Sequence, residues 1–379
     1  MPYLYLDHAA ATPLDPEVFD AMVPVLKEQY YNPSALYLPA RDVANQLGLA
    51  RQRTAAVLGV KPSEIIFTAG GTEANNLAIR GIMDAYSGKN CIISAIEHDS
   101  VKAPAALYDA KLCGVDDSGC ISLSSLEQLI DDDTVLVSIM YVNNEIGTIQ
   151  PLREVAELLN KVRKSRTQRG IKLPLYFHTD ACQAGNYLSL NAHQLGVDMA
   201  TVNGSKLYGP KQSGCLYVAA GVKLCPLVYG GGQESGLRSG TENVASVVGF
   251  SHALKKAQAM RTKETKRMAD LQKAIVHELP LQIPGAQVNG SIKRRIPNNL
   301  NIVLPGVDNE RLIMELDVRG IACAAGSACS ASKEEPSATL QAIGLAEADI
   351  RSSIRISMGR GTSRADIERL IAELRSLTV

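Results

Sequence analysis

The chain has 379 residues, of which 46% are hydrophobic and 21% are charged, as in ordinary soluble globular proteins. Its 39 basic and 39 acidic residues cancel, so no overall field attracts it to nucleic acid or to a membrane surface. We therefore expect small-molecule ligands. The length exceeds what one hydrophobic core usually organises, which predicts two domains.

The N-terminal stretch MPYLYLDHAA is interrupted by Asp7 too soon for a signal peptide or a membrane span, and no later run reaches spanning length. We therefore expect a cytoplasmic protein. The eight cysteines include no Cys-x-x-Cys pair, so the sequence suggests neither a zinc site nor a disulfide framework. Free thiols are expected, and one of them could be reactive.

Short apolar, β-branched runs alternate with longer helical patterns, which predicts βαβ units and a mostly parallel sheet. The runs are EIIFTA (64–69), NCIISAI (90–96), TVLVSIMYV (134–142), LPLYFHTD (173–180), VDMATVNG (197–204) and GCLYVAA (214–220). An amphipathic pattern over 251–279 predicts a long helix that leads into a second domain. Strand runs and helices mix in that domain, over 285–379.

A basic stretch without acidic residues precedes the fourth run. A contact for tRNA or an acidic partner is one interpretation, but such stretches are more often solvated helix ends, which we expect here. Its charged residues are Lys161, Arg163, Lys164, Arg166, Arg169 and Lys172.

Polar residues follow five of the apolar runs. Ligands of open parallel sheets bind at the carboxyl ends of the strands, so these residues should gather in one place. They are, run by run, Gly70 to Glu73; Glu97 and His98; Asn143, Asn144 and Glu145; Asp180 and Gln183; and Asn203, Ser205 and Lys206.

Three of these features together favour pyridoxal phosphate (PLP) as a cofactor. The turn Gly70–Thr72 between a strand and a helix could hold a phosphate, although a plain glycine turn is equally compatible. Lys206 after a buried strand could form a Schiff base with a carbonyl cofactor, unless it is a surface lysine. Asp180 would be a costly buried charge unless paired, and a pyridinium nitrogen is one such partner; a helix cap is another use.

Over nearly its whole length, the chain resembles the cysteine desulfurases of the nitrogen-fixation and iron–sulfur-cluster-assembly type, which are class V enzymes of PLP fold type I. The shared motifs are YLDHAAATPLDP, FTAGGTEANNLAI, EHDSV, SIMYVNNEIGTIQP, HTDACQA, SKLYGPKQSGCLYV, GGGQESGLRSGTEN, AGSACSASKEEPS and SIRISMGR. The resemblance implies an α/β fold of the PLP-dependent transferase type. A large domain (15–255) would contain a mostly parallel seven-stranded sheet flanked by helices, and residues 1–14 and 256–379 would form a smaller α+β domain.

The resemblance also implies roles around the cofactor ring. Lys206 matches the Schiff-base lysine, Asp180 the pyridinium partner, and Gln183 and Asn144 the contacts to the ring hydroxyl region. His98 matches the imidazole that stacks on the ring and transfers protons, although alone it would more often be a satisfied core histidine.

The phosphate and the substrate carboxylate would be bound by other matching residues. Arg355 would clamp the carboxylate with its planar fork, assisted by Asn32. The phosphate would be held by Gly71, Thr72, Asn203, Ser205 and, from the neighbouring subunit of a homodimer, Thr241.

Cys329 lies in AAGSACSAS, a run of small residues without a core pattern, which suggests a loop that could carry a thiol toward the cofactor. A small buried cysteine is the alternative. Cys323, six residues earlier, falls where the resembling family has an apolar residue, so we interpret it as structural.

Three positions depart from the pattern of that family. Ser205 and Tyr37 stand where histidines are usual, and Asn203 stands where a serine is usual. These changes weaken the match at the predicted phosphate site and at the entrance of the site. The sequence also ends at RSLTV, without the extension with which some relatives dock a scaffold protein, which leaves that partner open.

These residues predict a PLP-dependent cysteine desulfurase that converts L-cysteine to L-alanine and transfers the sulfur to Cys329 as a persulfide. The sulfur would serve iron–sulfur cluster assembly or tRNA thiolation, through an acceptor protein. Expected absences are a metal site, a membrane contact and a direct nucleic-acid contact. The alternatives are another class V enzyme (a selenocysteine lyase, an aminotransferase or a kynureninase) and a catalytically weakened binding platform.

Overall fold

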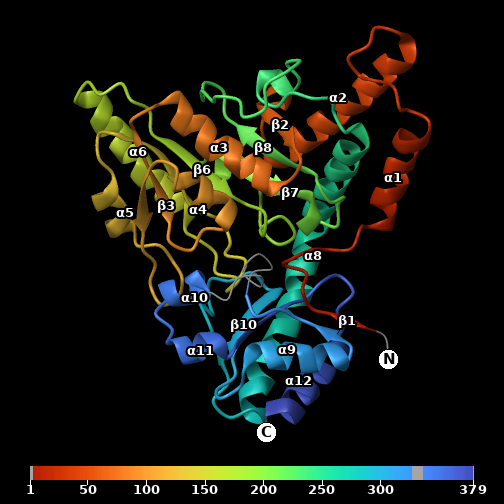
Figure 1. Ribbon diagram of the computed structural model, residues 1–379, viewed down its shortest axis with the longest axis vertical. Helices are drawn as coiled ribbons and strands as arrows, with labels where there is room; N and C mark the ends of the chain where they lie inside the picture. Colours follow the sequence, from red (N-terminus) through yellow and green to blue (C-terminus); the bar gives the residue numbers. More distant parts are fainter. Residues whose placement is uncertain (1–2, 327–335, 379) are drawn as a thin grey trace.

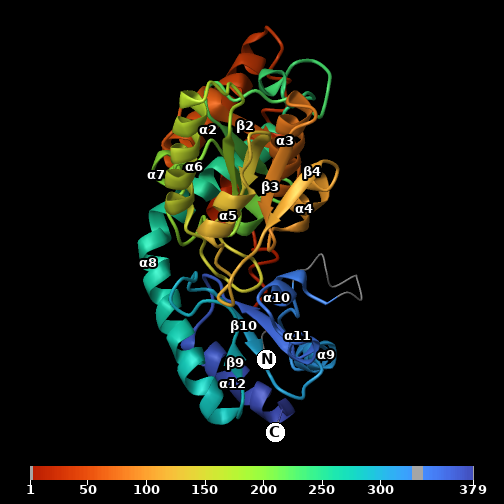
Figure 2. The same ribbon diagram turned by 90° about the vertical axis from the view of Figure 1, so that its left-hand side faces the viewer.

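The computed structural model describes residues 3–326 and 336–378. A larger part containing a seven-stranded sheet lies above a smaller part with two short sheets (Figure 1). Helix α8 (Val244–Gln282) runs without interruption along one side of both parts, as the turned view in Figure 2 shows. The predicted domain boundary at residue 255 falls inside this helix, and the division into two domains stays a prediction.

The larger sheet has the strand order β2-β8-β7-β6-β5-β3-β4. All neighbouring pairs are parallel except those of β8, which runs antiparallel to both β2 and β7. The predicted mostly parallel sheet is therefore confirmed. Its strands are β2 (Ile65–Thr68), β3 (Asn90–Ser94), β4 (Asp109–Cys113), β5 (Thr134–Ser138), β6 (Tyr176–Asp180), β7 (Met199–Asn203) and β8 (Gly214–Val218).

Both faces of this sheet are covered, which explains why most of its strands form continuous apolar runs. Successive residues point to opposite faces, so Ile66 packs under α3 while its neighbours Ile65 and Phe67 belong to the core on the other side. One face carries α3 (Gly71–Ala85) and α4 (Asp99–Ala105). The other carries α2 (Leu38–Leu58), α5 (Leu123–Leu129), α6 (Leu152–Gln168), α7 (Ala192–Leu195) and the first half of α8, while α1 (Pro16–Lys27) packs on α8.

The smaller part contains the antiparallel sheet β12-β10-β9 and a parallel pair of β1 with β11. Because β1 (Leu4–Tyr5) pairs with β11 (Ile321–Ala322), the start of the chain lies with its last third. The other elements are β9 (Gln287–Val288), β10 (Asn299–Val303), α9 (Asn309–Val318), α10 (Ala338–Ala342), α11 (Glu347–Arg351), β12 (Ser353–Ser357) and α12 (Arg364–Thr378). Across the two described ranges, no helix combines the length and the apolar character that a membrane span requires.

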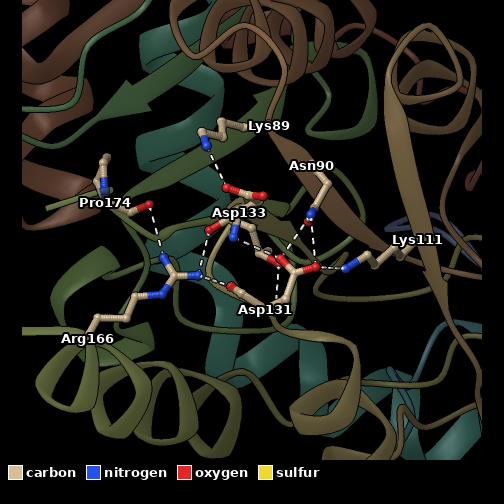
Figure 3. A network of polar contacts seen from close by, with 8 residues as sticks. Lys89, Asn90, Lys111, Asp131, Asp133, Arg166 and Pro174 are labelled. Atoms are coloured by element: carbon tan, nitrogen blue, oxygen red, sulfur yellow. Dashed lines mark hydrogen bonds and ion pairs between the residues drawn. The ribbon is translucent and has the colours of Figure 1, made fainter. Parts of the chain in front are cut away.

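The basic stretch at the end of α6 is partly structural, so the expectation of a solvated helix end is wrong for Arg166. Its side chain is 2% exposed and donates to the main-chain oxygens of Asp131, Thr134 (2.8 Å) and Pro174, as Figure 3 shows. The exposed Arg169 instead forms a bidentate ion pair with Asp132. Arg166 thus ties α6 to the start of β5 and to the segment before β6.

We predict that Arg166→Met lowers the free energy of unfolding by about 2 to 3 kcal/mol, because it removes the hydrogen bonds from a buried guanidinium to three main-chain oxygens. The matched change Arg169→Met removes only an exposed ion pair and should cost less than about 1 kcal/mol. Urea denaturation of both variants and the wild type measures the difference. Equal losses would contradict a structural role that is specific to Arg166.

Candidate active site

A cavity of about 180 Å³ lies at the carboxyl ends of the strands of the larger sheet. Strand β2 reaches this edge because β8 is antiparallel to both β2 and β7, so β2 and β7 point the same way. The cavity brings together nine of the predicted site residues: Gly71, Thr72, His98, Asn144, Asp180, Gln183, Asn203, Lys206 and Arg355.

Lys206 ends the short 3-10 helix that follows β7, and its side chain points to the N-terminal segment. Its Nζ donates to the main-chain oxygen of Ala10, and its own carbonyl accepts from Asn186 Nδ2 at 2.7 Å. Gln183 Nε2 donates to the carbonyl of Ala9 at 2.9 Å. The N-terminal segment is therefore a wall of the cavity, which the sequence did not indicate.

A hydrogen-bonded chain links Asp180 to His98 through two residues that sequence reasoning missed. Asn75 Nδ2 donates both to Asp180 Oδ2 (2.7 Å) and to Ser100 Oγ (2.8 Å), and Ser100 Oγ lies 2.8 Å from His98 Nδ1. The other carboxylate oxygen of Asp180 accepts from the backbone N–H of Cys182 at 2.9 Å. Asn75 lies four positions after Gly71 on α3, and this spacing, which puts both on one face of the helix, was the available signal.

The backbone of Ser100 fixes the tautomer of His98. The backbone N–H of Ser100 donates to His98 Nδ1 at 3.1 Å, which also caps the N-terminus of α4. A ring nitrogen that accepts a hydrogen bond cannot carry a proton, so the neutral imidazole carries its proton on Nε2. His98 thus presents a hydrogen-bond donor at Nε2.

The N-terminus of α3 faces the cavity without a side-chain cap. Gly70 is the N-cap residue, and its φ of 123° lies where side chains are disfavoured. A Cβ on Gly71 would lie 2.8 Å from Cys182 Sγ, so a larger residue there would require the side chain of Cys182 to move. The first-turn N–H groups and the positive end of the helix therefore remain available to an anion in the cavity.

Arg355 lies on β12 and is 1% exposed. Its Nη2 pairs with Asp7 Oδ1 at 2.7 Å, and its Nη1 donates to the carbonyl of Asn144 at 3.1 Å. Its Nε has no hydrogen-bond partner among the residues that the structure describes. Because Arg355 also lines the cavity, it is placed to meet an anionic ligand.

Four predicted residues are not part of this cavity. Asn32 is exposed in the connection between α1 and α2, where its Oδ1 accepts from the N–H of Ser34. Ser205 donates its hydroxyl to Asn203 Oδ1 at 3.0 Å. Thr241 lines a separate cavity of about 170 Å³, which leaves open its predicted role across a subunit boundary. Cys329 lies outside the described residues.

Cys323 is buried beside Asp7 and Arg355. Burial raises the pKa of its thiol to about 12; Asp7 adds to the increase, whereas Arg355 opposes it. The thiol therefore stays protonated at neutral pH, which agrees with a structural cysteine.

Residues 4–370 match the family described as aminotransferase class-V. The chain belongs to the class-V aminotransferase family. Curated relatives in this family include "Cysteine desulfurase IscS" of Dictyoglomus turgidum, 39% identical over 99% of this chain and 96% of its own length. "Cysteine desulfurase IscS" of Methanosarcina thermophila is 37% identical over 97% of this chain and 90% of its own length.

Solved structures of similar proteins cover the chain equally well. A structure named "NIFS-LIKE PROTEIN" has a TM-score of 0.90 and 31% identity, covering 99% of this chain and 98% of its own. "SspA in complex with cysteine" has a TM-score of 0.79 and 32% identity, covering 94% and 98%. The predicted fold type I architecture of class-V aminotransferases is therefore confirmed.

Class-V aminotransferases depend on PLP, and the cavity residues fit this group. The uncapped end of α3 at Gly71 suits its phosphate, and Asp180 presents a carboxylate that suits its pyridinium nitrogen. Lys206 supplies the amine. The match rests on this donor set and on its gathering in one cavity.

Below the cavity, the buried His178 of β6 bridges its neighbouring strands. Its Nδ1 lies 2.8 Å from Ser138 Oγ of β5, and its Nε2 lies 3.1 Å from Thr201 Oγ1 of β7. Burial lowers its pKa to about 4, against a smaller opposing effect of Asp180. The ring is therefore neutral at physiological pH.

We predict that His178 makes the fold sensitive to acid. Between pH 6.5 and 4, the unfolded chain binds a proton at this histidine that the folded protein does not bind. The free energy of unfolding therefore decreases as the pH is lowered through this range. The full loss is on the order of 3 kcal/mol. His178→Gln should show a shallower pH dependence in urea denaturation, whereas His193→Gln, at an exposed position, should leave it unchanged. An unaltered slope in His178→Gln would contradict the assignment.

Proposed function

We propose that this chain is a PLP-dependent cysteine desulfurase, which removes the sulfur of L-cysteine and releases L-alanine. The observation that carries the proposal is one cavity containing Lys206, Asp180, His98 and Arg355, in a chain whose curated relatives are named cysteine desulfurases. PLP, when bound, supplies an electron sink for negative charge that develops on the substrate carbon atoms.

The residues of the chain divide the remaining work. Lys206 would carry the cofactor and exchange protons with the substrate, and His98 would donate a hydrogen bond from its Nε2 N–H. Asp180, oriented by Asn75 and by the N–H of Cys182, stabilises the protonated pyridinium nitrogen. Arg355 binds the substrate carboxylate.

Cys329 accepts the sulfur in this proposal. Its thiolate attacks the sulfur of the substrate, an S–S bond forms, and the bond between the substrate Cβ and sulfur breaks. The electron pair of that bond stays with the substrate carbon, which takes up a proton and leaves as L-alanine. The product on the protein is a persulfide.

The proposal extends to the surroundings of the enzyme. We propose a homodimer in which Thr241 of one subunit contacts the phosphate in the other and Asn32 assists substrate binding. We further propose a cytoplasmic location, the domain division at residue 255, and a sulfur-acceptor protein of iron–sulfur cluster assembly or tRNA thiolation. No contact of the described residues favours a different class V reaction or a binding platform.

Covalent trapping of the cofactor tests the role of Lys206. After borohydride reduction of the PLP-loaded protein, peptide mapping should find the label on Lys206, and Lys206→Ala should carry none. Lys211→Ala is the matched control, because Lys211 lies nearby but donates to the carbonyl of Thr12; it should keep the label. A label on a different lysine would show that the assignment is wrong.

The two cysteines of the C-terminal part should behave differently. Cys329→Ser should still change the cofactor absorbance on addition of L-cysteine. It should form alanine at least about 100-fold more slowly than the wild type, because it lacks the nucleophile. Cys323→Ser should stay within about twofold of the wild type, since its thiol is protonated. Mass spectrometry of Cys329 after incubation with L-cysteine detects the added sulfur. Exchanged outcomes for the two variants would refute the choice of nucleophile.

A further inference from the structure

Glu145 is a buried carboxylate beside the cavity that does not line it. It is 8% exposed and follows Asn144 in the loop after β5. The side chain of Asn143 shapes this loop: its Oδ1 accepts from the N–H groups of Glu145 (2.8 Å) and Ile146 (3.0 Å), and its Nδ2 donates to the carbonyl of Ile96 (2.9 Å). Glu145 is therefore presented from a fixed backbone.

Both oxygens of Glu145 accept hydrogen bonds from the chain segment that follows residue 335. Ser337 Oγ donates to Oε2 at 2.6 Å, and Thr339 Oγ1 donates to Oε1 at 3.0 Å. Ser337 is also the N-cap of α10, because its Oγ accepts from the N–H of Leu340. Hydrogen bonds to a carboxylate are among the stronger ones in proteins, so this pair is a firm attachment.

Apolar packing reinforces the attachment. Ile146, next to Glu145, forms a small buried cluster with Leu340 of α10, with Ile343 directly after α10 and with Ile350 of α11. Helix α10 lies in the smaller part, where it faces the larger part in both views (Figures 1 and 2). The loop after β5 thus holds the start of α10 across this junction.

The segment that precedes residue 327 is attached to the same place. The backbone of Ala324 pairs with that of Arg355, with hydrogen bonds of 3.2 and 2.5 Å. Arg355 Nη1 in turn donates to the carbonyl of Asn144, the residue before Glu145. The chain on either side of 327–335 is therefore fixed to one group of residues: Arg355, Asn144 and Glu145.

We infer that Glu145 is a positioning residue for sulfur transfer, an inference that rests on the proposed function of Cys329. Ser337 lies eight positions after Cys329 and Ala324 five positions before it, so these two fixed ends together restrict where the cysteine can lie. Releasing Ser337 and Thr339 removes one of these two fixed ends, and a less restricted thiol has a lower effective concentration near the substrate. Arg355 itself is held by β12 and by its ion pair with Asp7, and it makes no hydrogen bond to Ser337 or Thr339 among the described contacts.

The test compares turnover with substrate binding in the full-length, PLP-loaded protein. Glu145→Gln keeps the shape of the side chain but loses the charge that strengthens both hydrogen bonds. We expect kcat for alanine formation to fall about tenfold, while KM and the L-cysteine concentration that half-saturates the absorbance change stay within about twofold. A parallel loss of binding, or an unchanged kcat, would overturn the inference.

Further variants separate positioning from general destabilisation. Ser337→Ala should reproduce much of the fall in kcat. The double variant Glu145→Gln/Ser337→Ala should lower kcat little further, because both changes remove the same attachment. Thr339→Ser keeps the hydroxyl, so its kcat should stay near that of the wild type. Thr339→Val keeps the packing but lacks the hydroxyl, and it should lower kcat about threefold. It also serves as the test if Glu145→Gln folds poorly. The inference would be overturned if the two single-variant falls in kcat multiplied in the double variant, or if Thr339→Ser and Thr339→Val lowered kcat equally.

A matched carboxylate elsewhere completes the design. Glu347 pairs with Arg351 on α11 and is exposed, so Glu347→Gln should leave kcat unchanged; a tenfold fall there would overturn the specific role of Glu145. Failure of the proposed function is distinguishable, because the wild type would then form no alanine from L-cysteine or carry no sulfur on Cys329. Failure of the inference leaves the wild type active and sulfur on Cys329.

Discussion

The guanidinium of Arg355 is almost completely buried, and a buried charge is tolerated only when it is paired. Asp7 supplies the counter-charge, and the carbonyl of Asn144 takes a second hydrogen bond. The pair therefore joins three distant parts of the sequence: the N-terminal segment, β12 and the loop after β5. Without Asp7 the charge would stand unpaired in the core, which explains why the start of the chain belongs to the site.

The path of the N-terminal segment follows from this pairing. Ser357, two residues after Arg355 on β12, donates its N–H to the carbonyl of Leu6 and accepts at its Oγ from the N–H of Ala9. Ala9 and Ala10 then form the wall that Gln183 and Lys206 contact. The position of the amine of Lys206 thus depends on a segment held from the smaller part.

The sequence predicted the sheet well because its strands are buried on both faces and form continuous apolar runs. Strand β4 was missed, since this edge strand exposes Asp109 and Leu112 and so lacks such a run. The strand-end rule predicted the cavity residues of the larger sheet, but it could not find Asn75 or Ser100, which lie on helices behind them. Arg355 was found only through resemblance, because its partner Asp7 lies 348 positions away. Asn32 was also assigned only through resemblance, and the proposed role of Thr241 involves a second subunit, which no pattern within one chain can position.

The contacts of Arg355 determine how a carboxylate ligand could bind without disturbing the loop after β5. Asp7 and Asn144 occupy its two terminal nitrogens, whereas its Nε has no partner among the described residues. A carboxylate that bonds to Nε leaves the contact with Asn144 intact, so the loop that presents Glu145 keeps its position. A carboxylate that displaced Asp7 would instead release the N-terminal segment and, with it, the wall beside Lys206. The first mode preserves every attachment of the cavity, but Nε is itself buried, so the side chains around it must move before a carboxylate can reach it.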